Sequence, residues 1–78
     1  MDQKIIERGE RAKQTLQDEV ISEALSDLEN TLVDSWKAAN TTEHREELWF
    51  TLKGLSRFKT LLEGAIVSGE YEASPEAQ

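Results

Sequence analysis

Two apolar stripes with the same spacing lie on either side of a short polar segment, and they constrain the fold more than any other feature of the chain. The first stripe comprises Ile21, Leu25, Leu28, Leu32, Ser35 and Ala39. The second comprises Leu48, Leu52, Leu55, Lys59, Leu62 and Ile66. Both alternate steps of four and three residues, the seam of a helix that packs against another helix. The pattern predicts two long, mutually packed helices.

The polar segment Asn40-Thr41-Thr42 predicts where the first long helix ends and the second begins. Either threonine can cap the amides of the following turn. Acidic residues follow at once, where the helix dipole favours negative charge. Folding the chain back here places Leu32 near Leu52 and Trp36 near Leu48. We therefore expect an antiparallel helical hairpin over residues 18–68.

Residues 1–17 predict an additional N-terminal helix, or an extension of the next one. Ile5, Gly9, Ala12 and Leu16 form a narrow stripe, and Asp2 is a suitable N-cap. This stripe is out of phase with the next one, which predicts a bend near residues 17–20. Gly69 is a suitable residue to follow the last helix, and we expect a flexible acidic tail over 69–78. The predicted fold class is all-α.

Composition excludes several kinds of protein. A chain of 78 residues allows one domain, and its core is small enough that oligomerisation often supplements it. There is no cysteine, and the formal net charge of −7 disfavours direct nucleic-acid binding. No apolar run reaches the roughly 18 residues of a transmembrane helix, and the first residues do not resemble a secretory signal. We expect no membrane association and a cytoplasmic location.

Residues 48–66 carry a further apolar stripe beside the one that begins at Leu48, and this further stripe predicts an oligomer interface. It comprises Phe50, Gly54, Phe58, Leu61 and Ala65. Together the two stripes cover about half of the helix circumference, whereas a helix facing one partner needs a stripe of about 100°. We expect a second copy of the chain to cover this stripe. The alternative is a three-helix monomer in which residues 1–17 cover it.

Two polar faces are further candidates for binding. Arg45, Trp49, Lys53 and Arg57 recur every four residues, and an aromatic ring among cations can stack on a base or on a partner. Alternatively, Trp49 folds onto Trp36 or packs at an interface. Glu23, Asp27 and Asp34 form an acidic face that either contacts a basic partner or is simply solvated.

Nothing in the sequence predicts catalysis, and we expect a protein that is not an enzyme. The only histidine, His44, has only carboxylates nearby in sequence, whereas a zinc site needs three or four converging ligands. No Ser/His/Asp arrangement or phosphate-binding loop is present, and a helical hairpin offers no cleft that excludes water. We expect no metal and no cofactor.

The stretch from residue 28 to residue 70 resembles a pattern in small helical-hairpin proteins of tailed bacteriophages. The residues that carry it are Leu28, Leu32, Trp36, Arg45, Glu46, Leu48, Trp49, Leu52, Leu55, Leu62 and Gly69. The resemblance implies a structural or assembly role, in the virion or the host cytoplasm. Together with the predicted interface stripe, it leads us to expect a self-associating protein of this kind. It also leaves open an anti-defence protein that binds a host protein or sequesters a nucleotide signal.

Overall fold

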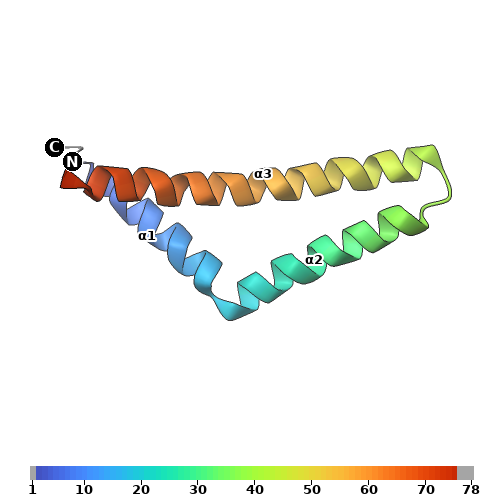
Figure 1. The fold of residues 1–78 in the computed structure, drawn as a ribbon, viewed down its shortest axis with the longest axis horizontal. Helices are drawn as coiled ribbons and strands as arrows, with labels where there is room; N and C mark the ends of the chain where they lie inside the picture. The colour runs from blue at the N-terminus through green and yellow to red at the C-terminus, as the bar shows by residue number, and fades with distance from the viewer. Residues whose placement is uncertain (1, 76–78) are drawn as a thin grey trace.

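The structure is a computed structural model and describes residues 2–75, which form three α-helices and no β-strand. These are α1 (Gln3–Gln17), α2 (Glu19–Ala38) and α3 (Thr42–Ala73) (Figure 1). The predicted all-α fold is confirmed. None of the three described helices contains an apolar stretch of the length that a membrane crossing requires.

Each helix begins at a capping side chain. Asp2 accepts hydrogen bonds from the amides of residues 4 and 5, and Thr41 accepts one from the amide of His44 at 3.2 Å. Asp18 has an extended conformation, which ends α1, and its carboxylate accepts from the Ile21 amide at 3.0 Å, which starts α2. These caps satisfy amides that have no partner within their helix. The predicted cap at Asp2 is confirmed, Thr41 is the one of the two candidate threonines that caps α3, and the expected bend lies at Asp18.

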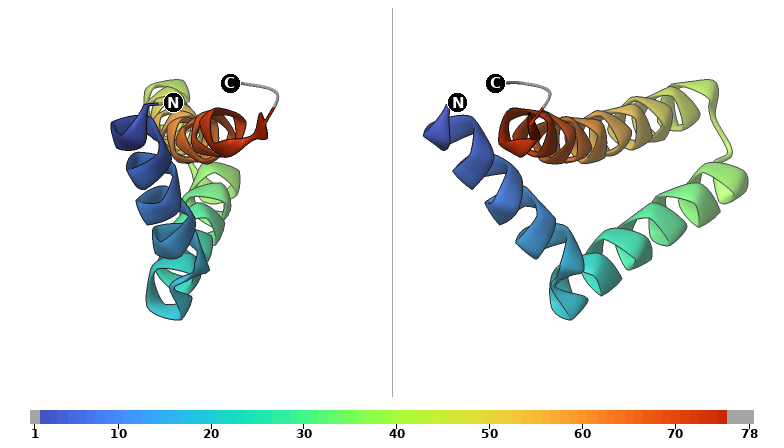
Figure 2. Two further views of the ribbon diagram at one scale, coloured as in Figure 1. Left: turned by 90° about the vertical axis from the view of Figure 1, so that its left-hand side faces the viewer. Right: turned by 60° about the vertical axis from the view of Figure 1, so that its left-hand side comes forward.

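The three helices form the sides of a narrow triangle. α3 is the long side, and α1 and α2 meet at Asp18 in a corner that points away from it (Figures 1 and 2). α1 crosses the C-terminal part of α3, and α2 approaches the N-terminal part. The molecule measures 55 × 23 × 16 Å, and its radius of gyration is 16.6 Å. A compact domain of this length has a radius of gyration of about 11–12 Å, so this chain is open and elongated.

Two glycines bring α1 and α3 into backbone contact. A Cβ atom on Gly9 would lie 2.8 Å from the Ala65 carbonyl oxygen and 2.9 Å from the Gly69 Cα. Both glycines are buried, and beside them Ile6 and Ala12 are among the few buried apolar residues. The tightest packing in the described chain therefore lies at this crossing.

The expectation that Gly69 follows the end of the last helix is wrong. α3 runs through Gly69 to Ala73, so residues 69–73 of the expected flexible tail are helical. The physical reason is the contact with α1, because a glycine within the helix allows an approach that any side chain would block. The Asp2 amide also donates to Glu72 Oε2 at 3.2 Å and ties the start of α1 to this last turn. Residues 76–78 of the expected tail lie outside the described residues.

Away from that crossing, the chain leaves much apolar surface uncovered. No large side chain among residues 2–75 is fully buried. On α2 the seam residues Leu25 and Leu32 are only half-buried, and Leu28 is exposed. The accessible surface of the chain is 6145 Å², whereas a folded monomer of this mass exposes about 4,800 Å². The chain thus exposes about 1,300 Å² more than a compact monomer would.

Candidate interaction surfaces

The predicted interface stripe lies along α3 and is largely exposed. Phe50 is 64% exposed, Phe58 51% and Leu61 62%. Apart from its own helix backbone and its chain neighbours, no described atom lies within 4 Å of the position a Cβ on Gly54 would take, while Ala65 is half-buried beside α1. α1 therefore covers only the C-terminal end of this stripe. Nothing among residues 2–75 covers the part between residues 50 and 61 well enough to bury its large side chains.

A groove of about 360 Å³ runs between this stripe and α1. Its apolar wall comprises Phe58, Leu61, Leu62 and Ala65 on α3, with Ala12 on α1. Arg8 and Arg11 of α1 line it as well, and within residues 2–75 neither forms an ion pair. The sequence interpretation did not single out these two arginines. The only available signal was the excess of basic residues before residue 18.

The predicted cationic face around Trp49 is only partly assembled. Lys53 Nζ lies 4.4 Å from the centre of the Trp49 ring, and the Phe50 ring contacts Trp49 edge-on at 5.2 Å between centres. Arg57 lines a shallow depression beside Lys53. Trp49 is 47% exposed and its ring contacts are these two residues, so the alternative in which it folds onto Trp36 does not describe the structure.

Arg45, the first member of that predicted face, is engaged elsewhere. Its Nε donates to the Ala39 carbonyl at 3.2 Å, and its guanidinium carbon lies 5.8 Å from the centre of the Trp36 ring. The Ala39 carbonyl lies at the end of α2, where carbonyl groups have no hydrogen-bond partner within the helix. Arg45 therefore closes the turn between α2 and α3, and a ligand at Trp49 would meet only Lys53 and Arg57.

The acidic face on α2 is solvated and carries apolar neighbours. Glu23, Asp27 and Asp34 are all exposed, and none forms an ion pair within residues 2–75. Val20 is 72% exposed and Leu28 47%. The sequence analysis gave Val20 no role. This face of α2 therefore combines carboxylates that have no ion pair within residues 2–75 with exposed aliphatic groups.

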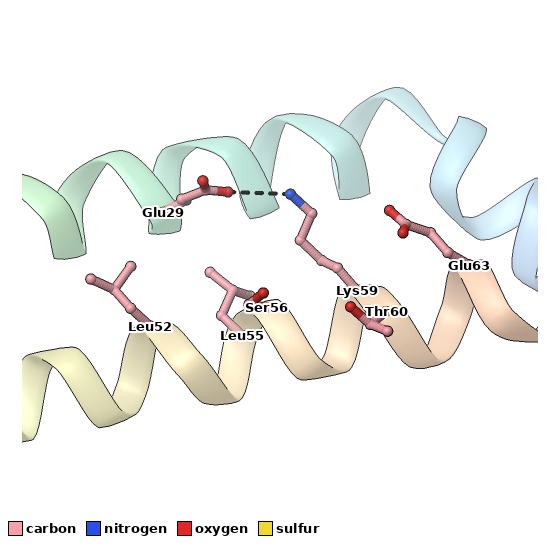
Figure 3. A pocket seen from close by; sticks show the side chains of 7 residues that line it. All are labelled: Glu29, Leu52, Leu55, Ser56, Lys59, Thr60 and Glu63. Atoms are coloured by element: carbon pink, nitrogen blue, oxygen red, sulfur yellow. Dashed lines mark hydrogen bonds and ion pairs between the residues drawn. The ribbon is translucent and has the colours of Figure 1, made fainter.

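One ion pair links α2 to α3. Lys59 Nζ lies 3.2 Å from Glu29 Oε2, above Leu52 and Leu55, in a depression of about 230 Å³ (Figure 3). Both side chains are between one third and one half exposed, and such pairs contribute about 0–1 kcal/mol. Lys59 is the only polar member of the stripe from Leu48 to Ile66, and its ion pair therefore links α3 weakly to α2 at this position.

His44 sits in the first turn of α3, and its Nδ1 lies 3.9 Å from the Glu47 carboxylate. Both side chains are more than half exposed. Within residues 2–75, no three His, Cys, Asp or Glu side chains converge as metal ligands would. The α3 stripe with its groove and the α2 face, in contrast, both expose large apolar side chains.

No protein-family model, no curated protein sequence and no solved structure matches this chain.

Proposed function

We propose that this chain is a non-enzymatic, self-associating helical protein that works by binding other macromolecules. In the proposed unit, α2 and α3 form the antiparallel hairpin and α1 is the additional N-terminal helix. The observation that carries the proposal is the accessible surface of 6145 Å², about 1,300 Å² above the value for a compact monomer. Association with a second copy would remove such an excess from water.

The size of the excess suits a permanent assembly. If each of two copies covered about 1,300 Å², the interface would bury about 2,600 Å² in total, and obligate homodimers bury about 2,000–5,000 Å². The groups available for burial are large and apolar and include two aromatic rings, a residue type that is enriched in interfaces. Phe50, Phe58 and Leu61 are each more than half exposed on one side of α3. We propose that these three side chains lie at the centre of the interface.

The biological role that we propose follows the resemblance to small proteins of tailed bacteriophages. In that setting a self-associating helical protein would serve a structural or assembly role, with its partners among other phage or host proteins. The feature of this chain that supports such a role is the exposed apolar surface of its helices. Such a surface suits repeated contact between proteins better than it suits the binding and turnover of a small substrate.

The proposal predicts a change of mass on Phe58→Glu. We expect wild type to be a defined oligomer by light scattering, and we expect the variant to dissociate to a monomer at the same concentration. The glutamate would place a charge in an apolar contact, where an unpaired ion is costly. Because Phe58 is half-exposed in the single chain, the variant should retain helical circular dichroism.

Val67→Glu is the matched control. Val67 is 64% exposed on the same helix, nine residues from Phe58 and therefore about 180° away around the helix axis. We expect this variant to keep the wild-type mass. A wild-type protein that is monomeric at every concentration would contradict the proposal, and equal dissociation of both variants would remove the α3 stripe as its location.

A second function, the sequestration of a nucleotide signal by a phage anti-defence protein, draws on the Trp49 ring with Lys53 above it. We rank it second because Arg45 is engaged at the α2–α3 turn. We expect ATP and cyclic di-AMP to leave the melting temperature unchanged within about 1 °C. A ligand at roughly 100 times its Kd would stabilise the fold by about 2.7 kcal/mol, so a shift that Lys53→Ala and Arg57→Ala abolish would reverse this ranking.

A further inference from the structure

We infer that the groove between α1 and α3 receives helix α2 of a second copy of the chain, in a reciprocal dimer. This inference rests on the proposed self-association and specifies which surfaces meet. Two observations carry it: the two surfaces have opposite charge, and their apolar centres have similar lengths.

The groove offers an apolar floor with a basic edge. Phe58 and Leu61 are more than half exposed on the α3 side, and Arg8 and Arg11 lie on the α1 side without ion pairs among residues 2–75. α1 as a whole has four basic and two acidic residues, a net charge of +2. An occupant that satisfies this groove should therefore bring aliphatic groups flanked by carboxylates.

The N-terminal half of α2 has that composition. At 100° per residue, Val20 and Asp27 lie about 20° apart around the helix, with Glu23 on one side of them and Leu28 on the other. All four residues are exposed. α2 as a whole has five acidic residues and one basic residue, a net charge of −4. Its free carboxylates would face the two arginines once the aliphatic groups enter the groove.

The lengths also correspond. Val20 and Leu28 are eight residues apart, which is about 12 Å along a helix, and Phe58 and Ala65 are about 10 Å apart. The charges decide between possible pairings of the helices. Packing α2 on α2 would oppose net charges of −4 and −4, whereas packing α2 on the α1 side of the groove opposes −4 and +2.

A two-fold axis makes the contact occur twice. In a symmetric dimer, any contact from a residue of one copy to a residue of the other is repeated in reverse. Each chain carries both the groove and the α2 face, so each copy would donate one α2 helix and receive one. The assembly closes on itself and leaves neither groove empty.

The test uses two double variants with reversed charge. Arg8→Glu/Arg11→Glu places acidic residues opposite the acidic α2, and Glu23→Lys/Asp27→Lys places basic residues opposite the basic edge. All four residues are exposed in the single chain, so each variant should fold. We expect the dimer Kd, measured by sedimentation, to rise at least about tenfold for each variant alone, because like charges meet at both contacts.

Mixing the two variants restores attraction at both contacts, since glutamates then meet lysines at one and arginines meet native carboxylates at the other. We expect a heterodimer at concentrations where neither variant dimerises, and we expect the chain with all four substitutions to dimerise again. Val20→Ser provides a measurement that does not depend on charge. It should weaken the dimer severalfold, because it removes the most exposed of the large apolar groups.

The outcomes separate this inference from the proposed function. A monomeric wild type would overturn both. A wild-type oligomer that neither double variant nor Val20→Ser weakens would overturn only the seating of α2, and would indicate direct packing between α3 helices. A weakened oligomer that the mixture fails to restore would also overturn it, since opposite charges then do not meet.

Discussion

Replacing Gly9 with alanine is expected to lower the free energy of unfolding by about 1–3 kcal/mol, the cost of forcing atoms into a packed contact. The new Cβ would lie 2.8 Å from the Ala65 carbonyl oxygen and 2.9 Å from the Gly69 Cα, both backbone atoms. No rotamer change can relieve this contact, so α1 must move away from α3. Gly69→Ala should behave alike, with its Cβ 2.9 Å from the Gly9 Cα. Chemical denaturation at a fixed protein concentration measures the change.

Gly64→Ala is the control for the glycine substitutions. Gly64 also lies within α3, but apart from its own helix backbone and its chain neighbours no described atom is within 4 Å of the position its Cβ would take. Alanine has a helix propensity about 1 kcal/mol better than glycine, so this variant should be more stable than wild type. If Gly9→Ala and Gly64→Ala shift stability in the same direction, the α1–α3 crossing does not form as described.

The melting temperature of wild type is expected to rise with protein concentration. In the proposed dimer, a chain in which no large side chain among residues 2–75 is fully buried would depend on its partner for much of its stability. For a dimer that unfolds to separate chains, a roughly 100-fold dilution lowers the stability by about 2.7 kcal/mol. With about 2–4 °C per kcal/mol for an assembly of this size, the melting temperature should fall by about 5–10 °C. Circular dichroism at two concentrations with two path lengths measures it.

Phe58→Glu supplies the comparison for this dilution series. If it is a monomer, its melting temperature should be lower than that of wild type at high concentration and should not change on dilution. A wild-type melting temperature that is constant across the series would show that the single chain is stable without association. The bare stripe on α3 would then need a partner other than a second copy.

The helices themselves were predictable because local signals determine them. Spacing in steps of three and four residues specifies a helix whatever it packs against, and a cap is a local hydrogen bond between a side chain and an amide. Asp2 therefore caps α1 as expected, and one of the two candidate threonines, Thr41, caps α3. The bend expected near residues 17–20 lies at Asp18, which serves both as the end of α1 and as the cap of α2.

Gly69 shows where local signals are ambiguous. A glycine near the end of an apolar stripe is suited to a helix terminus, and equally to a close contact between helices. Only the partner decides, and the partner here is Gly9, which is 60 positions away in sequence. The two small residues of the narrow N-terminal stripe, Gly9 and Ala12, are both buried at the crossing. Small size on one side of a helix is thus a signal of close approach.

The candidate surfaces were predictable only as faces of single helices. Phe50, Phe58 and Leu61 share a side of α3 by spacing alone, and the structure leaves them exposed. The groove was not predictable, because it depends on how far α1 tilts from α3. Arg45 belonged to the Trp49 face by spacing, but its side chain instead donates a hydrogen bond to the Ala39 carbonyl at the end of α2. A helical wheel contains no information about the turn that precedes the helix.

The hydrogen bond from Asp2 to Glu72 has a practical use, because it places the beginning of α1 and the last turn of α3 at the same pole of the molecule. The α2–α3 turn lies at the other pole, along a long axis of 55 Å (Figure 1). Spectroscopic labels at residues 3 and 40 would therefore act as markers of the two poles. In a dimer, the distance between the two labels at residue 3 and the distance between the two labels at residue 40 would show how the chains are oriented. They would distinguish side-by-side chains that point the same way from chains that point in opposite directions.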